Sequence, residues 1–418
     1  MPYDIRNKAQ HVEGKKRIEW ARRHMPVLES IGARFQKEKP FKGLTIGMCL
    51  HVEPKTCILA STFARGGAEV AITGCNPLST QDSAAASLAI DYGLNVYTWY
   101  NESSKDYYKN LNRVLGHKPD IIIDDGCDLI FLLHKKRRDL LPSIIGGCEE
   151  TTTGIHRLAV MAKEGALKFP VFNVNDAQTK HFFDNRYGTG QSTLEGIMTA
   201  TNTILAGKTI VIAGYGWCGR GAAMRARGMG ANIVVTEIDP VKAIEAKMDG
   251  FRVMPMDLAA KEGDIFITAT GNVNVIDKKH FPTMKDGAIV SNTGHFDVEV
   301  NISALKSLSK RVANVRKDVD EYLLKSGKRI YLLAQGRLVN LACAQGHAIE
   351  VMDMSFANQA LCAEFLAKNH HKLKPDLYCV PPKIDNTVAQ LWLKSKGVKI
   401  DSLTSQQKKY MSSWDNGT

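Results

Sequence analysis

Residues 209–221 read Thr-Ile-Val-Ile-Ala-Gly-Tyr-Gly-Trp-Cys-Gly-Arg-Gly, an apolar run that leads directly into a glycine-rich turn. Three of the glycines, Gly214, Gly216 and Gly219, follow the spacing GxGxxG, and a helix-compatible run over Ala222–Met229 comes next. In this pattern the first glycine permits a tight turn, the second lets the backbone approach a pyrophosphate, and the third lets the helix pack closely on the strand. The pyrophosphate then meets unpaired N–H groups at the helix N-terminus. The stretch therefore predicts a strand, a turn and a helix that bind a dinucleotide.

An acidic residue after the next apolar run indicates which dinucleotide binds. Asn232–Val235 leads to Glu237, at the distance of roughly 20 residues where a carboxylate binds the ribose hydroxyls. A carboxylate repels a 2′-phosphate, so Glu237 favours NAD over NADP. The nearby Lys242 does not fit a preference for NAD over NADP, and we interpret it as a solvated lysine on a helix.

Apolar runs and helical patterns alternate on both sides of this turn. Strands are expected at 44–50, 69–73, 96–99, 121–124 and 172–175, and again at 209–213, 232–237, 264–268 and 287–291. A helix pair over 14–38 precedes them, a helical connection spans Asp184–Ala206, and helix returns at Val351–Asn369. This alternation predicts an α/β fold with two doubly wound parallel sheets and a helical C-terminal segment. We divide the chain into domains at 1–186 and 187–347 and a segment over 348–418, since 418 residues exceed the usual single core.

Composition narrows the class of protein. The chain is 44% hydrophobic and 23% charged, which is typical of a globular protein. Its net charge of +12 is spread along the chain, and the densest cluster, Lys135–Arg138, is interpreted as a helix face, so no nucleic-acid partner is predicted. Nine cysteines without a CxxC pair favour reduced thiols in a cytoplasmic protein. The polar stretch 1–20 argues against a signal peptide, and the chain has no apolar run of about 18 residues that could span a membrane.

Motifs outside the glycine turn carry a family resemblance. They are Cys49-Leu50-His51, Asp124-Asp125-Gly126, Glu149–Gly154 (EETTTG), Asn173–Asp176 with Lys180, Phe183-Asp184-Asn185, Ser291–Asp297 (SNTGHFD), Gly336–Leu341 (GRLVNL) and Gly346-His347. In this order and spacing the chain resembles the S-adenosylhomocysteine hydrolase family, from about residue 15 to residue 410. The resemblance implies a substrate domain and an NAD domain joined by a hinge, in a homo-oligomer that is a tetramer or a dimer. It also implies that the C-terminal segment returns to the substrate domain and reaches a neighbouring subunit.

The resemblance also implies the reaction, which is the reversible hydrolysis of S-adenosyl-L-homocysteine to homocysteine and adenosine. Tightly held NAD oxidises the ribose 3′-hydroxyl to a ketone, and the C4′ proton then becomes acidic. Removal of that proton expels homocysteine, water adds, and the ketone is reduced again. The net reaction is hydrolysis of a nucleoside thioether, which is why a hydrolase carries a dehydrogenase-like domain.

Residue roles follow from the same resemblance. Lys180 and Asp184 are expected near the 3′-hydroxyl, where a lysine with a lowered pKa can take the proton, and Asn185 supports the relay. His51 and Asp125 are the acid–base candidates on the 5′ side. The expected substrate-binding set is His51, Lys55, Asp125, Glu150, Lys180, Asp184, His295 and His347. The expected NAD-binding set is Thr151, Thr152, Thr153, Asn185, Gly214, Gly216, Trp217, Cys218, Gly219, Glu237, Thr270, Gly271, Asn272, Thr293, Gly294, His295, Asn340 and His347; no metal site is expected.

Each residue alone has a simpler explanation. Taken singly, His51 would be structural, Lys180 a surface lysine, Asp124 and Asp125 a turn, and Thr151–Thr153 a helix start. Their joint order and spacing argue against these explanations. Two rival functions remain: an NAD-dependent dehydrogenase, which would not need this set, and a non-catalytic homologue that senses nucleotides, which would usually have lost it.

The purine-binding segment departs from the family pattern. Val52-Glu53-Pro54-Lys55-Thr56 stands where many members carry Met-Thr-Val-Glu-Thr, whose glutamate accepts a hydrogen bond from the adenine amino group. Lys55 can only donate, and hypoxanthine presents a carbonyl oxygen at that position. One hypothesis is therefore that S-inosyl-L-homocysteine is a substrate. The other is that Lys55 points elsewhere, for example to Glu53, and that adenine binds through backbone groups.

Three other departures are smaller. Thr189 replaces a cysteine common in the family, and Gln335 replaces the glutamate of the family's LLAEGR. The sequence ends at Trp414–Thr418 without the Lys- and Tyr-bearing tail that reaches a neighbour's NAD in many members. We therefore expect looser NAD retention than in relatives with the tail.

Overall fold

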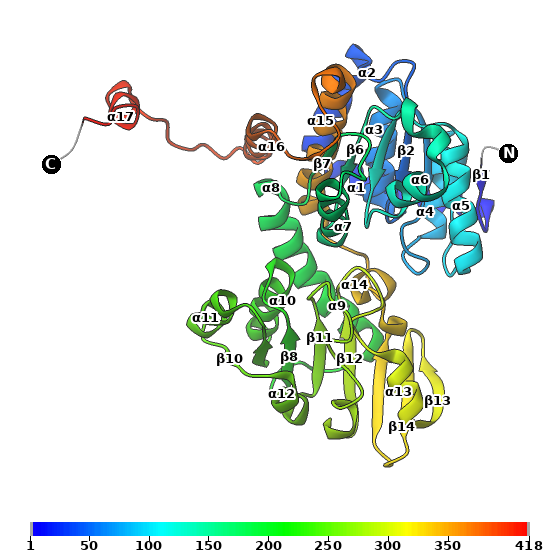
Figure 1. Cartoon of the computed structure of the whole chain (residues 1–418), viewed down its shortest axis with the longest axis vertical. Coiled ribbons are helices and arrows are strands. Elements are labelled where there is room, and N and C mark those ends of the chain that lie inside the picture. The colour runs from blue at the N-terminus through cyan, green and yellow to red at the C-terminus, as the bar shows by residue number, and fades with distance from the viewer. Residues whose placement is uncertain (1–2, 416–418) are drawn as a thin grey trace.

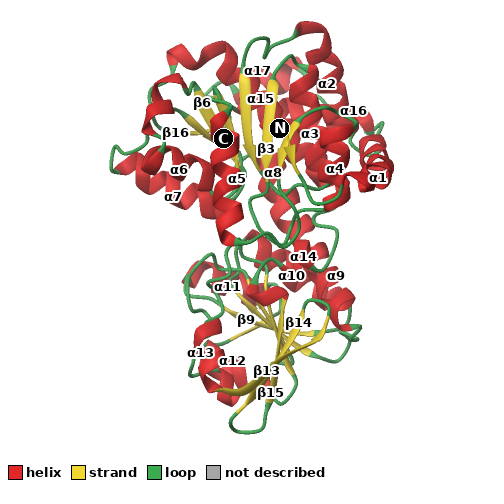
Figure 2. Ribbon diagram, turned by 90° about the vertical axis from the view of Figure 1, so that its right-hand side faces the viewer, coloured by secondary structure: helices red, strands yellow, loops and turns green. Residues whose placement is uncertain are grey.

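Two parallel-dominated sheets, each covered by helices on both faces, form two lobes in the computed structural model, which describes residues 3–415 (Figures 1 and 2). The first sheet has the order β1-β4-β3-β2-β5-β6-β7-β16 and is parallel throughout. Its strands are β1 (Tyr3–Asp4), β2 (Thr45–Cys49), β3 (Glu69–Thr73), β4 (Asn95–Tyr97), β5 (Ile121–Asp124), β6 (Gly146–Glu149), β7 (Val171–Asn173) and β16 (Leu377–Cys379). Its helices are α1 (His11–Arg23), α2 (Pro26–Glu38), α3 (Pro54–Arg65), α4 (Asp82–Ile90), α5 (Ser104–Gly116), α6 (Asp128–Lys136), α7 (Thr152–Lys163) and α8 (Gln178–Lys180).

The second sheet has the order β10-β9-β8-β11-β12-β15-β14-β13. Its strands are β8 (Thr209–Ala213), β9 (Asn232–Thr236), β10 (Arg252–Val253), β11 (Ile265–Thr268), β12 (Ala288–Asn292), β13 (Ser309–Arg316), β14 (Val319–Leu324) and β15 (Arg329–Leu333). Its helices are α9 (Thr189–Thr201), α10 (Trp217–Gly228), α11 (Pro240–Met248), α12 (Met256–Glu262), α13 (Ile302–Leu308) and α14 (Val339–Ala342). The predicted α/β class is confirmed.

One edge of the second sheet was not predicted. β14 pairs antiparallel with both β13 and β15, so a three-stranded meander extends the parallel part of the sheet. Gly327, with φ of 93°, lies in the tight turn between β14 and β15, and a left-handed residue of this kind suits a short hairpin. The sequence analysis placed no strands over 309–333, so the predicted parallel sheet did not include this antiparallel edge.

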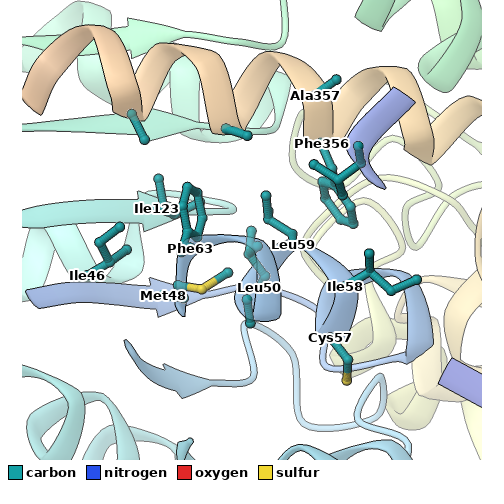
Figure 3. Packing of buried hydrophobic residues seen from close by; sticks show 14 of the residues in the cluster. Ile46, Met48, Leu50, Cys57, Ile58, Leu59, Phe63, Ile123, Phe356 and Ala357 are labelled. Carbon is teal, nitrogen blue, oxygen red and sulfur yellow. The ribbon is translucent and has the colours of Figure 1, made fainter. Parts of the chain in front are cut away.

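The C-terminal segment packs against the first sheet. α15 (Ile349–Asn369) places Phe356 and Ala357 in the same buried cluster as Phe63 of α3 and Ile123 of β5 (Figure 3). After α15, β16 pairs with β7 as the last strand of the sheet. The sequence did not indicate β6, whose Gly146 lies so close to α15 that a Cβ there would be 2.5 Å from a methyl carbon of Leu366.

The connection between the lobes is not a uniform α-helix. Residues His181–Gly188 form a π-helical stretch, and α9 continues from Thr189 to Thr201, a few residues short of the predicted end at Ala206. π-helical turns are rare and are frequent at functional sites. This stretch brings Lys180 and Asn185, five residues apart, into direct contact.

Beyond these elements, α16 (Pro382–Ser395) packs on the first lobe, and α17 (Ser405–Met411) extends away from both lobes (Figure 1). Residues 416–418 of the predicted short tail lie outside the described residues. No helix within residues 3–415 is both long enough and apolar enough to cross a membrane.

Candidate functional site

The candidate site lies where neighbouring parallel strands of the first sheet end. His51, Asp125, Glu150 and Asn175 come just after β2, β5, β6 and β7, which are adjacent in the sheet. In open α/β sheets, ligands bind in the crevice outside these carboxyl ends. Parallel pairing thus gathers residues from four separate motifs into one cleft.

A buried lysine is surrounded by oxygen atoms on one side of this cleft. Lys180 Nζ donates to Asn185 Oδ1 at 2.8 Å, lies 3.0 Å from Asp184 Oδ2 and lies 3.5 Å from Glu150 Oε1. Asn175 Oδ1 in turn accepts from Asn185 Nδ2 at 3.0 Å. The predicted neighbourhood of Lys180, Asp184, Asn185 and Glu150 is therefore present in the structure.

The charge state of Lys180 differs from the expectation. Burial alone would lower the pKa of Lys180, but the carboxylates of Asp184 and Glu150 outweigh burial, so the pKa is raised. The expected lowered pKa is wrong because the two acids stabilise the ammonium form. Burial likewise favours the neutral form of Asp184, yet Lys180 and His347 hold its pKa below the usual range. The resting pair is thus an ammonium and a carboxylate.

His347 connects the segment before α15 to this cluster. Its Nδ1 forms a short contact with Asp184 Oδ1, while its Nε2 lies 3.2 Å from Thr189 Oγ1 and 3.1 Å from Asn340 Nδ2. Thr189, the residue that replaces the family's cysteine, therefore contributes a hydroxyl group to the site. Asn340 Oδ1 is buried and has no partner among the described residues, so it is free to accept a hydrogen bond from a ligand.

Glu150 is held by two residues of α15 that the sequence analysis missed. Ser355 Oγ donates to Glu150 Oε1 at 2.5 Å, and Gln359 Nε2 donates to Oε2 at 2.5 Å. Burial raises the pKa of Glu150 to about 7, although Lys180 opposes that shift. The i, i+4 spacing of Ser355 and Gln359 on a helix was the only sequence signal, and it gained meaning only once α15 was seen to pack on β6.

A second cluster lies on the other side of the cleft. His51 Nε2 is 3.4 Å from Asp125 Oδ2, and His295 Nδ1 is 3.6 Å from Asp125 Oδ1. Burial lowers the pKa of His51 to about 4, so the imidazole is neutral at neutral pH. On the other edge of the ring, His51 Nδ1 contacts Ser79 Oγ at 2.8 Å.

Gly126 lies against His295. It has φ of 104°, and a Cβ at this position would be 2.2 Å from His295 Nε2, so only glycine allows the imidazole to lie this close to the backbone.

The purine-binding segment is buried at the N-terminus of α3. Lys55 Nζ lies 3.0 Å from Glu53 Oε2 and donates to the carbonyl oxygen of Gln345 at 2.9 Å. The contact with Glu53 is the one that the second hypothesis names. Gln81, which precedes α4, has a buried Oε1 without a partner in the described chain. Gln81 was not singled out from the sequence.

The glycine turn fits a pyrophosphate. β8 ends at Ala213, α10 begins at Trp217, and a Cβ on Gly219 would be only 1.9 Å from the carbonyl oxygen of Gly214. No atom lies within 4 Å of the corresponding Cβ position on Gly216, and no side chain caps α10. The helix N-terminus is thus open, as NAD binding requires.

The ribose acid is fixed beside this turn. Glu237 Oε2 accepts from the backbone N–H of Tyr215 at 2.7 Å, and Oε1 accepts from Ile238 and Asp239. The carboxylate therefore stands at the end of β9, and its remaining lone pairs are open to hydroxyl donors. This placement agrees with the role expected for Glu237.

The other predicted NAD-binding residues line the edge that faces the first lobe. Thr270, Gly271 and Asn272 follow β11, with Asn272 exposed, and Thr293, Gly294 and His295 follow β12. Glu299 accepts from the backbone N–H groups of Thr270 and Gly271 and so holds that loop. Across the cleft, Thr151 occupies the N-cap position of α7 without a side-chain capping bond, and Thr152 and Thr153 begin the helix. Thr153 Oγ1 is 3.9 Å from the Cβ position of Gly271. Trp217 and Cys218 begin α10, where the Trp217 ring stacks on His181 at 5.0 Å.

Comparisons with known proteins agree with this layout. The family model described as S-adenosyl-L-homocysteine hydrolase matches residues 2–143, and the model of that family's NAD binding domain matches residues 185–346. The chain is 62% identical to an S-inosyl-L-homocysteine hydrolase of Methanocaldococcus jannaschii, with 100% of both chains covered. It is 58% identical to an S-inosyl-L-homocysteine hydrolase of Methanococcus maripaludis, with 97% of both covered. It is also 57% identical to an adenosylhomocysteinase of Aquifex aeolicus, with 100% of both covered.

Proposed function

The chain belongs to the S-adenosyl-L-homocysteine hydrolase family, and on that premise we propose that it hydrolyses a purine nucleoside thioether of homocysteine with the help of bound NAD. One observation carries the proposal. The Lys180 cluster and the His51–Asp125 pair face the same cleft, at the ends of adjacent strands, opposite the loops of the NAD-binding lobe. A dehydrogenase of a simple hydroxy acid has no use for two separate proton-transfer groups.

In this proposal the Lys180 cluster acts at the 2′ and 3′ hydroxyls of the ribose, and the His51–Asp125 pair acts at its 5′ carbon. When bound, NAD would supply a reversible oxidant for the ribose 3′ carbon. We assign the diol to Glu150 and Asp184, because hydroxyl groups donate well to ionised carboxylates. The Lys180 ammonium stabilises negative charge on the 3′ oxygen. The proton of the 3′-hydroxyl passes through Lys180 to Glu150. A pKa of about 7 suits Glu150 for taking up and returning this proton near neutral pH.

His51 and Asp125 serve the 5′ side in this proposal. A neutral imidazole can take a proton at Nε2, and Asp125 Oδ2 at 3.4 Å stabilises the imidazolium that results. Ser79 holds Nδ1 and thereby aims the other ring nitrogen into the cleft. This pair would exchange protons with the leaving thiolate and the entering water.

The second candidate concerns the purine, and buried polar atoms favour hypoxanthine over adenine. Lys55 has three N–H donors, of which Glu53 and Gln345 face two. Gln81 Oε1 is a buried acceptor without a partner among residues 3–415. Hypoxanthine offers a carbonyl acceptor at C6 and an N–H donor at N1. Adenine instead offers an amino donor at C6 and an acceptor at N1. A donor from Lys55 and an acceptor from Gln81 would therefore suit the inosyl substrate.

We also propose the division into a substrate domain (1–186), an NAD domain (187–347) and a returning C-terminal segment (348–418) that contacts a second copy of the chain. Large apolar side chains support the last point, because Tyr410, Met411 and Trp414 are exposed on the arm around α17. Exposed apolar groups of this kind are typical of interaction sites.

The test of the function is a thiol-release assay with S-inosyl- and S-adenosyl-homocysteine. We expect homocysteine to form catalytically without net accumulation of NADH. Stoichiometric NADH would identify a dehydrogenase. Nucleoside binding without thiol release would identify a sensor.

Gln359→Met tests the assignment of Glu150. The change removes a donor to Glu150 Oε2, and it also removes the buried Gln359 Oε1 that has no partner in the described structure. Loss of a hydrogen bond to a buried charged group costs about 1–3 kcal/mol, so we expect kcat/KM to fall roughly 5- to 150-fold. Because the ionised form of Glu150 loses support, its pKa rises, and the acid limb of the pH–rate profile moves to higher pH.

Asn358→Leu is the matched control for Gln359→Met. Asn358 is equally buried on α15 but donates to Thr179 Oγ1 and to Met354, and Glu150 is not among its partners. Its replacement should lower thermal stability and leave the pH profile unmoved. Equal shifts of the profile in both variants would refute a specific role of Gln359.

A further inference from the structure

The short helix that carries Lys180 is capped by a residue from the far end of the chain. α8 begins at Gln178, and Ala177 at its N-cap position has no side-chain acceptor. The first backbone N–H groups of a helix have no acceptor inside the helix, so they need one from elsewhere. Asp385 of α16 supplies it: Oδ2 accepts from the N–H of Gln178 at 2.7 Å, and Oδ1 accepts from the N–H of Thr179 at 2.9 Å. The hydroxyl group of Thr179 donates to the same carboxylate.

We propose that Asp385 is a positioning residue, which caps α8 and thereby holds Lys180 at its distances from Asp184 and Glu150. Lys180 directly follows the capped Thr179, so a shift at the start of α8 passes to its side chain. α8 also continues into the π-helical stretch and α9, so the cap fixes the first-lobe end of the helical connection between the lobes. The effect on turnover rests on the proposed function, whereas the effect on α8 does not.

The helix that carries Asp385 is itself firmly held. Ile384, Val388 and Leu391 lie on one face of α16 and pack against the buried cluster of the first lobe. β16, which precedes α16, pairs in parallel with β7, which precedes α8. The two helices therefore begin side by side, at the same edge of the sheet, and the carboxylate needs no further ordering to reach α8.

The charge of Asp385 suits this position. Asp385 lies in the first turn of α16, so its carboxylate is close to the N-termini of both α16 and α8. Helix N-termini carry a partial positive charge that a carboxylate stabilises. An asparagine at this position has nearly the same shape, but it loses the charge and one of the two acceptor oxygens. Asp385→Asn is therefore the most selective change.

A second distant cap in the chain provides a matched control. Asp353 of α15 accepts from the N–H groups of Val27 and Leu28 at 3.0 and 2.7 Å, which repeats at α2 the geometry of Asp385 at α8. α2 carries none of the residues assigned to the reaction. Asp353→Asn should thus lower Tm as Asp385→Asn does, but without an effect on Lys180.

The first measurement is hydrogen–deuterium exchange of the NAD-loaded protein, read by mass spectrometry. In Asp385→Asn the amides of Gln178 and Thr179 should exchange roughly 3- to 30-fold faster, the range that corresponds to loss of a helix cap. Asp353→Asn should leave these amides unchanged and speed exchange at Val27 and Leu28 instead. Unaltered exchange at Gln178 and Thr179 in Asp385→Asn would overturn the cap.

The second measurement is the kinetics of thiol release. A displacement of about 1 Å can lower a rate about 10²-fold, so kcat of Asp385→Asn should fall about 10- to 100-fold, with a much smaller change in KM. Asp385→Glu keeps the charge and should recover part of kcat, and Asp353→Asn should keep the kcat of the parent. Normal kcat in Asp385→Asn, or an equal loss of kcat in Asp353→Asn, would overturn the positioning role. Failure of the proposed function appears separately, as an absence of thiol release in the parent, and leaves the exchange measurement valid.

Discussion

Lys180→Met is expected to lower kcat by about 10²–10⁴-fold, the range associated with loss of a positioned proton-transfer group. Lys180 Nζ is the one cation that lies within 3.5 Å of both Asp184 and Glu150 in the described structure. Without it, two buried carboxylates face each other and the 3′ oxygen loses its partner. The pKa of Glu150, already about 7, should rise further, because Lys180 now holds it down.

Stability is the main confounding effect of this change. Breaking a buried ion pair from one side typically costs about 3–5 kcal/mol, so a lower Tm is expected as well. The far-ultraviolet circular dichroism spectrum shows whether the variant is folded. Lys180→Arg keeps the charge but changes the geometry, and should be as stable as the parent while remaining strongly impaired. Lys242→Met, an exposed change on α11, should leave kcat unaltered; a kcat for Lys180→Met within a few-fold of the parent would refute the assignment.

The second large effect concerns the purine. The parent should prefer S-inosyl- over S-adenosyl-homocysteine by roughly 5- to 150-fold in kcat/KM, since a mispaired buried donor costs about 1–3 kcal/mol. Lys55→Gln should reduce or reverse this ratio, because an amide oxygen can accept from the adenine amino group. Lys55→Met should lower the inosyl rate without raising the adenosyl rate, which separates loss of a donor from gain of an acceptor.

Lys55→Glu completes this series. It restores the residue type common in the family but places a carboxylate beside Glu53, so some loss of stability is expected. A parent that clearly prefers the adenosyl substrate, with a ratio unaltered in Lys55→Glu, would contradict the role of Lys55. Lys55 would then act only as the partner of Glu53.

The site residues were expected from the family resemblance, and the structure places several of them at the carboxyl ends of parallel strands. The runs over Glu69–Thr73, Ile121–Asp124 and Thr209–Ala213 were predicted to the residue, and the last two lead directly into a motif at their carboxyl ends. Parallel pairing then brings those motifs together without further information. The same holds for the glycine turn, whose strand and helix are local in sequence.

What sequence reasoning missed depends on contacts between distant segments. Ser355 and Gln359 lie more than 200 positions from Glu150, and only the packing of α15 on β6 brings them together. The pKa of Lys180 was misjudged for a related reason, because burial and ion pairing oppose each other and only distances show which prevails. β13 was missed because most of its residues are exposed, so it lacks the apolar run that marks a strand in a sequence.

The most direct test of the account follows the hydrogen at C4′ of the ribose. Hydrolysis of S-inosyl-homocysteine in deuterium oxide, with mass spectrometry and NMR of the product nucleoside, reports whether that carbon loses its proton during turnover. The account predicts deuterium at C4′ in the inosine released by the parent, together with free homocysteine, and both products forming about 10²–10⁴-fold more slowly in Lys180→Met. Homocysteine release at full rate with the original hydrogen retained at C4′ would mean direct displacement at C5′, and would contradict the proposed roles of the Lys180 cluster and of NAD.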